Sequence, residues 1–229
     1  MTYYTVTGKL DGFGAQYFSV MSGIAFCEAK GYTYIHTPFV SIEHDVNVEE
    51  LNEFIGIKDT EERDTSTLTI SKNMFSREVL FSPRPSLYFT PAVIEKLRTF
   101  YYSTPKPDST PVDIAIHIRR GDVSKTANND RYNDNSIYVK LIKFLKTQYP
   151  SYTINVFSEG KLEDFKDLQL EDSQFRLNED IKTTFHSFVT AKVLVTAKSC
   201  LSYAAAILNP NTIYYISFWH RPLDHWRTV

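Results

Sequence analysis

The sequence predicts an α/β protein made of two halves, in each of which strands and helices alternate along the chain. Three observations lead to this prediction. Short β-branched or aromatic runs recur between longer segments whose apolar residues have helical spacing. A stretch with three prolines and no large apolar residue, 103–111, separates the two series. Such alternation is typical of parallel sheets, whose ligands bind beyond the carboxyl ends of the strands.

The composition excludes several classes of protein. Hydrophobic residues make up 42 % and charged residues 23 % of the 229 residues, as in a packed globular protein. Lys+Arg 25 against Asp+Glu 27 gives a net charge of −2, so nucleic acid is not an expected partner. The two cysteines indicate no disulfide framework. With neither a signal peptide nor a membrane span in the sequence, we expect a cytoplasmic protein.

The first half, residues 1–105, opens as a strand, a glycine-bearing turn and a helix. The strand is expected over residues 3–10, the turn is "DGFGAQ", and the helix runs from Gln16 to its stop at Gly31. Further elements are expected as a strand over 32–39, a helix over 47–57 capped by Asn47, a strand over 65–71, and a helix over 90–102 that begins with Thr90 and Pro91.

The second half, residues 106–229, repeats the alternation. Its first strand carries Ile114, Ile116 and Ile118 in a buried β-branched run. The elements that follow are expected as helices over 136–150, 161–168 and 199–208, and strands over 152–158, 193–196 and 212–216.

Two adjacent arginines, Arg119 and Arg120, end the first strand of this second half. A guanidinium stays charged, and its planar fork matches phosphate oxygens, so the pair suits a diphosphate. The alternative is that strand neighbours point to opposite sides, one in a salt bridge and one in solvent. The sequence spacing leaves both interpretations open.

Two further turns are suited to an anion. Gly12 and Gly14 allow backbone N–H groups to approach a ligand at a helix start, and Ser199 and Ser202 open another helix after another strand. Each has a simple alternative, a tight turn in the first case and a helix cap in the second. Because all three turns follow strands, we expect them on one rim.

The segment "HIRRGD", residues 117–122, resembles the His-x-Arg-Arg-x-Asp motif of the fucosyltransferase superfamily, which includes α1,2-, α1,6- and protein O-fucosyltransferases. "LDGFGAQYF", "VFSEG" and "VTAKSCLSYAAAILNP" resemble three segments of the α1,2 family, in the family's order. The resemblance implies the GT-B fold, with two Rossmann-like domains facing a cleft. Residues 1–105 would form the acceptor-side domain and residues 106–229 the nucleotide-sugar-binding domain.

The same resemblance implies an inverting transferase that needs no metal ion or other cofactor and moves a sugar, L-fucose from GDP-fucose in most members, to a glycan hydroxyl. The resemblance implies that Arg119 binds the β-phosphate of the donor and that Ser199 and Ser202 contact the same phosphates. The remaining nucleotide-sugar-binding candidates are Gly12, Gly14, His117, Arg120, Thr184 and His186. Thr184 stands where the α1,2 family has the aspartate that holds guanine, and Asp180 would fill that role only with a shifted register. The absence of an anchor suggests a bacterial or viral source.

The chemistry leaves a general base to be found. Departure of a diphosphate leaves extra charge on the β-phosphate, which an arginine stabilises in place of a divalent ion. Asp122 is our first candidate to deprotonate the acceptor, although it could equally brace Arg119; Asp130 and Asp134 are weaker candidates. Two alternatives stay open: a rhamnosyl- or xylosyltransferase with another nucleotide-sugar donor, and a non-catalytic nucleotide- or glycan-binding module.

Overall fold

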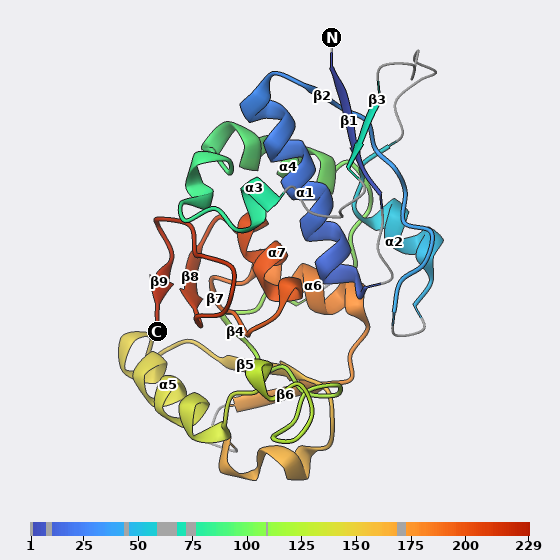
Figure 1. Ribbon diagram of the computed structural model, residues 1–229. Coiled ribbons are helices and arrows are strands. Elements are labelled where there is room, and N and C mark those ends of the chain that lie inside the picture. The colour runs from blue at the N-terminus through green and yellow to red at the C-terminus, as the bar shows by residue number, and fades with distance from the viewer. Residues whose placement is uncertain are drawn as a thin grey trace. The chain divides into compact units, whose positions relative to one another are not determined.

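The computed structural model describes residues 2–7, 11–43, 46–58, 68–71, 77–108, 110–168 and 173–229 (Figure 1). The chain forms two compact units. Unit 1 comprises Met1–Lys106 with Trp219–His225, and unit 2 comprises Pro107–Phe218 with Trp226–Val229. The strand pairings in the described sheets of both units are parallel, which confirms the predicted α/β class.

Unit 1 has a three-stranded sheet in the order β2-β1-β3. Tyr4 and Val6 of β1 pack with Cys27 of α1 in one apolar cluster. As predicted, α1 ends at Gly31, whose left-handed backbone (φ 68°) lets its N–H reach the Cys27 carbonyl. The elements of unit 1 are β1 (Tyr3–Val6), α1 (Phe13–Lys30), β2 (Thr33–Tyr34), α2 (Val48–Phe54), β3 (Leu68–Ser71), α3 (Arg77–Leu80), η2 (Pro85–Leu87) and α4 (Pro91–Tyr101).

Several predicted elements of unit 1 have different bounds. The helix expected from Gln16 begins at Phe13, because Gly12 is already extended and serves as its N-cap. The strand expected over 32–39 is only two residues long, Thr33–Tyr34. It lies at the sheet edge, and Pro38 lacks the N–H that a ladder needs. The predicted caps Asn47 and Thr90 are confirmed. Residues 8–10 and 65–67 of the predicted strands lie outside the described residues.

Unit 2 has a six-stranded sheet in the order β6-β5-β4-β7-β8-β9. Counted from β4, this order is 3-2-1-4-5-6, that of the doubly wound nucleotide-binding sheet. The elements are β4 (Ile114–His117), η3 (Asn129–Arg131), α5 (Asn135–Gln148), β5 (Ile154–Ser158), η4 (Leu162–Leu168), β6 (Ser173–Leu177), α6 (Ile181–Thr190), β7 (Val193–Val195), α7 (Cys200–Leu208), β8 (Thr212–Tyr215) and β9 (Arg227–Thr228).

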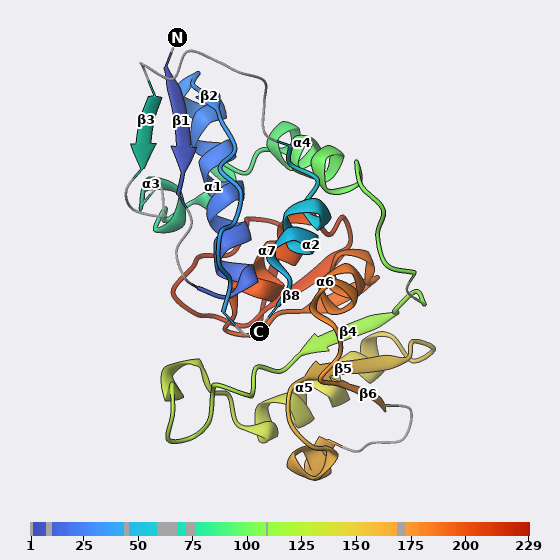
Figure 2. The same ribbon diagram turned by 90° about the vertical axis from the view of Figure 1, so that its right-hand side faces the viewer.

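The two faces of this sheet are covered by different helices (Figures 1 and 2). Ile114 and Ile116 point into the cluster that contains Leu141 and Ile142 of α5. On the other face, the ring of His117 lies 5.2 Å from that of Phe188 on α6. The chain winds from β4 outward to β6 and then returns to β7 on the other side of β4. The direction of winding therefore reverses between β4 and β7, at the topological switch point.

The sequence analysis did not predict β6, α6 as a helix, or β9. β6 offers only Phe175 and Leu177 as alternating apolar residues, and it is nowhere fully buried. The aromatic residues near the end of the chain pack onto other rings: the Trp226 ring lies 5.0 Å from that of Tyr203 in unit 2, and the His220 ring lies 4.9 Å from that of Phe18 in unit 1. Across the described part of the chain, no helix has both the length and the hydrophobicity to cross a membrane.

Candidate functional site

Arg119 and Ser199 meet at the switch point of the unit 2 sheet. Arg119 follows β4, Ser199 follows β7, and these strands are neighbours. The Nη1 of Arg119 donates a 3.2 Å hydrogen bond to the Oγ of Ser199. Two of the three turns that the sequence analysis singled out therefore come together, at the place where doubly wound sheets bind their ligands.

The guanidinium of Arg119 is only partly used by the protein. Its Nη2 pairs with Oδ2 of Asp122 at 2.7 Å, and the side chain is 22 % exposed. Its Nε is buried and has no hydrogen-bond partner among the described residues. A guanidinium carries five N–H donors, and a buried donor without an acceptor is costly. The group is therefore held in place with donors left over for an anion.

Ser199 presents a hydroxyl proton beside this guanidinium. It is the N-cap of α7, and its Oγ accepts hydrogen bonds from the Leu201 N–H at 3.3 Å and from Arg119. A hydroxyl has two lone pairs and one proton, so two accepted bonds leave the proton free to donate. The positive end of the α7 dipole lies at the same point. Two positive groups so close together favour an anion between them.

Ser202 lies one turn further along α7 and, like Ser199, is buried. Its Oγ accepts the Ala197 N–H at 3.0 Å and lies 3.5 Å from the Ser199 carbonyl oxygen. Ser202 thus ties together the turn that carries Ser199. Direct contact of Ser202 with a phosphate stays a prediction.

Arg120 points to partners of its own. It donates to the carbonyl oxygens of Arg119 and Asn133, at 2.8 and 3.0 Å, and to Oδ1 of Asn135 at 2.7 Å. Its guanidinium carbon lies 4.4 Å from the centre of the Tyr132 ring. The two arginines diverge, as strand alternation suggested, but Arg120 is fixed between the strand end and the following loop instead of lying in solvent.

The aspartates proposed as general bases are already engaged in the structure. Asp122 braces Arg119, and Gly121, with φ +78°, makes the turn that brings it back. Asp134 caps α5 through the Ser136 N–H and pairs with Lys125. The Ser136 hydrogen bonds and the Lys125 ammonium lower the pKa of Asp134 to about 2, so it is a weak base. Asp130 lies in η3, and its backbone carbonyl accepts a hydrogen bond from Lys198; its role as a base stays a prediction.

His117 lies behind the arginines and is buried, with 8 % of its surface exposed. Burial, with the nearby charge of Arg119, lowers its pKa to about 3, so its imidazole is neutral at pH 7. Thr184 and His186 are half-buried on α6, the helix whose Phe188 packs on His117. Asp180 is the N-cap of this helix and accepts the Lys182 and Thr183 N–H groups. The base-binding role of this region stays a prediction.

Gly12 and Gly14 belong to unit 1. Gly12 caps α1, and Gly14 is buried in its first turn. The Gln16 side chain fixes the preceding turn by donating to the Asp11 carbonyl at 2.6 Å and to the Ser41 carbonyl at 2.7 Å. The predicted contact of these glycines with the diphosphate or the sugar stays a prediction.

The sequence analysis did not identify Tyr132, Asn133 and Asn135 as partners of Arg120, nor Glu159 as a neighbour of the motif. A Cβ on Gly121 would lie 2.1 Å from Oε2 of Glu159, which follows β5. The usable signal was position: Tyr132 and Asn133 lie in the segment between β4 and α5, Asn135 is the first residue of α5, and Glu159 directly follows β5. Within the described ranges, no group of three or more His, Cys, Asp or Glu residues is placed to hold a metal ion.

Comparison with solved structures finds weak likenesses. An E. coli heptosyltransferase, WaaC with ADP-2-deoxy-2-fluoro heptose, is 12 % identical with a TM-score of 0.48, over 100 % of this chain and 93 % of that one. POFUT1 in complex with GDP is 11 % identical with a TM-score of 0.47, over 95 % and 98 %. WaaC with ADP is 13 % identical with a TM-score of 0.43, over 93 % and 64 %.

No protein-family model matches the sequence, and no curated protein is significantly similar to it.

Proposed function

We propose that the protein is a glycosyltransferase of the GT-B type that moves a sugar from a nucleotide diphosphate sugar to a glycan hydroxyl. The observation that carries the proposal is the Arg119–Ser199 hydrogen bond across the switch point. It brings a permanent cation, a free hydroxyl proton and a helix N-terminus to one place. These are the groups that bind a diphosphate and stabilise it as its charge grows.

The reaction would be a single displacement at the anomeric carbon. The acceptor oxygen forms the new glycosidic bond, the bond between that carbon and the β-phosphate oxygen breaks, and the configuration inverts. The charge left on the β-phosphate would be stabilised by Arg119 and Ser199, which are already in place before the reaction. The hydroxyl proton of the acceptor would pass to a carboxylate, for which Asp122 is the nearest candidate to Arg119.

Within this proposal the donor is GDP-fucose, and no metal ion takes part. Its support is the sequence resemblance of residues 117–122 to the fucosyltransferase motif, together with the Arg119–Ser199 pair, which would stabilise the diphosphate charge in place of a divalent ion. The GT-B arrangement of two domains about a cleft belongs to the same proposal.

Nucleotide binding tests the proposal directly. Melting temperatures are measured with GDP, UDP, ADP and CMP, for the wild type and for Arg119→Lys. A ligand at a hundred times its Kd stabilises the folded state by about 2.7 kcal/mol. We expect GDP to stabilise the wild type, and to stabilise the variant clearly less at the same GDP concentration. Stabilisation by UDP or ADP instead of GDP would indicate that the sugar donor carries that nucleotide. No stabilisation by any of the three diphosphates would overturn the proposal.

Turnover is then measured with GDP-fucose and a panel of glycans, in EDTA and with added manganese. We expect full activity in EDTA. Activity that disappears in EDTA and returns with manganese would contradict metal independence.

A further inference from the structure

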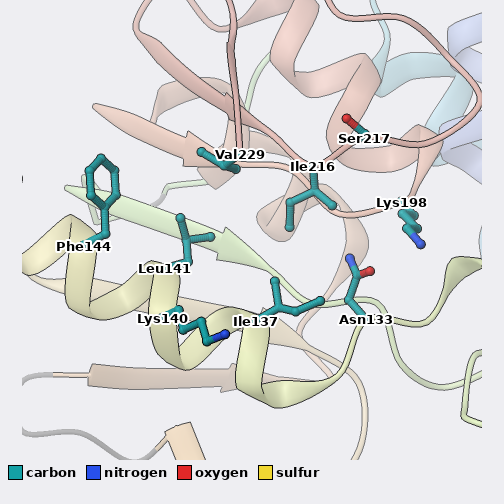
Figure 3. Close-up of a pocket in the computed structure, with 9 residues that line it drawn as sticks. All are labelled: Asn133, Ile137, Lys140, Leu141, Phe144, Lys198, Ile216, Ser217 and Val229. Carbon is teal, nitrogen blue, oxygen red and sulfur yellow. The ribbon is translucent and has the colours of Figure 1, made fainter.

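Unit 2 contains a pocket of about 510 Å³ beside α5 (Figure 3). Figure 3 shows Ile137, Leu141 and Phe144 of α5 on one side and Ile216 and Val229 on the other. Pockets of roughly 300–1,000 Å³ are typical of small-molecule sites. The remaining lining residues are Asn133, Lys140, Lys198 and Ser217.

The apolar walls of this pocket are unusually exposed to solvent. Ile137 is 46 %, Phe144 42 % and Val229 49 % exposed. Among the described residues, these are three of the ten large apolar side chains with the highest exposure, and all three line one cavity. Scattered exposed apolar residues need no explanation, but a cluster around a cavity indicates a binding surface.

The polar part of the lining has one sign of charge. Lys140 and Lys198 are the charged side chains of the pocket, and no Asp or Glu side chain is among its lining residues. The Lys198 Nζ donates to the Asp130 carbonyl oxygen at 3.0 Å, a neutral acceptor that leaves its charge uncompensated. Among the described side chains, no carboxylate forms an ion pair with Lys140 or Lys198. An apolar cavity with two cations fits a ligand that has an apolar body and an anionic group.

We propose that this pocket binds a small soluble amphiphilic anion, an alkyl or aryl phosphate ester, with its apolar body between α5 and Ile216 and its phosphate at Lys140 and Lys198. The site is separate from the diphosphate site but adjoins it. Lys198 directly precedes Ser199, and the Asn133 carbonyl accepts from Arg120. Binding of such an ester in this pocket does not require the proposed transferase activity.

The probes are n-octyl phosphate, n-octyl glucoside and inorganic phosphate, each kept below any micelle concentration and measured by isothermal titration calorimetry. The first has both features, the second lacks the charge, and the third lacks the chain. We expect octyl phosphate to bind tightest and inorganic phosphate to show no heat at this site. Each methylene added from butyl to octyl phosphate should tighten binding about three- to fourfold.

Amino-acid substitutions distinguish binding in this pocket from nonspecific binding to the protein surface. Lys140→Gln and Lys198→Gln should each weaken octyl phosphate about two- to fivefold, and Lys143→Gln, a lysine of α5 outside the pocket, should change nothing. Ile137→Glu adds a carboxylate to a half-exposed wall and should weaken binding at least about tenfold and abolish the methylene dependence. Leu162→Glu, at an exposed site outside the pocket, is its control.

Four results would overturn the proposal. These are no binding of octyl phosphate at millimolar concentration, equal binding of octyl glucoside, equal losses in the control variants, and binding to anionic lipid vesicles without binding to the soluble ester. GDP binding, measured in the same variants, keeps the two sites distinguishable, because Ile137→Glu should leave the Kd for GDP unchanged.

Discussion

The guanidinium of Arg119 lies 3.2 Å from the hydroxyl oxygen of Ser199, from which it is separated by 80 positions in the sequence. The contact joins the ends of two neighbouring parallel strands, β4 and β7. Each side chain still has a hydrogen-bond donor available in this contact: Arg119 has a buried Nε–H without a partner among the described residues, and Ser199 has its hydroxyl proton. The two side chains hold each other in position while keeping donors for a ligand.

Replacing Arg119 with Lys should weaken GDP binding at least about tenfold and lower turnover by a factor of roughly 100. Lysine keeps the charge but loses the fork that contacts Ser199 and Asp122 together. Calorimetry with GDP and steady-state kinetics measure the two effects. Arg227→Lys is the matched control, because Arg227 is an exposed arginine of unit 2 whose Nη1 donates to the Tyr214 hydroxyl. Equal turnover in the wild type and Arg119→Lys would remove the core of the mechanism.

The two serines of α7 should behave differently. Ser199→Ala removes a hydrogen-bond donor aimed at the ligand, so GDP affinity should fall about tenfold. Ser202→Ala removes the buried acceptor of the Ala197 N–H, so the free energy of unfolding should fall by about 1–3 kcal/mol, with a smaller effect on GDP. Urea unfolding and GDP titration of both variants separate the roles. If both variants lose stability and neither loses affinity, α7 has only a capping serine and no ligand site.

The α/β class, the parallel pairing and the order of most elements could be predicted because they depend on local patterns. The isoleucines at 114, 116 and 118 alternate, Asn47 and Thr90 cap their helices, and Gly31 ends α1. These signals act within a few residues of the chain. β6 was missed because its own sequence offers only two alternating apolar residues. What holds it as a strand is its pairing with β5, which has no local signal in the sequence of β6.

The candidate site could be predicted only as a set of residues. The sequence placed Arg119 and Ser199 at strand ends, and the parallel sheet brings those ends together. It did not indicate that Ser202 is buried or that Arg120 is held by Asn133 and Asn135. Such facts depend on how a side chain packs against a loop whose path has no local signature.

Two glycines with the same backbone conformation should tolerate alanine very differently. Gly31 has φ +68°, and no atom of the described residues lies within 4 Å of an added Cβ. At Gly56, with φ +72°, a Cβ would lie 1.9 Å from the Phe100 carbonyl oxygen. Gly31→Ala should cost about 1 kcal/mol of unfolding free energy, from the left-handed backbone alone. Gly56→Ala should cost at least about 2 kcal/mol more, because backbone atoms must move. Equal losses in urea unfolding would contradict the close contact between residue 56 and α4.

Acid should destabilise the protein through its buried histidines. The pKa of His117 is lowered to about 3 by burial and by the charge of Arg119, against 6.5 for an exposed histidine, and burial lowers that of His220 to about 4. The unfolded state therefore binds more protons between those values, so this stability is complete above pH 6.5 and is lost as the pH falls. Each such histidine costs about 1.4 kcal/mol per pH unit below 6.5. His117→Gln removes one titrating group. Between pH 6.5 and 4.5, the unfolding free energy of this variant should therefore fall by about 1.4 kcal/mol less per pH unit than that of the wild type. His225→Gln, which removes an exposed imidazole, is the control; parallel curves for the wild type and His117→Gln would mean that the imidazole of His117 is accessible to solvent protons in the folded state.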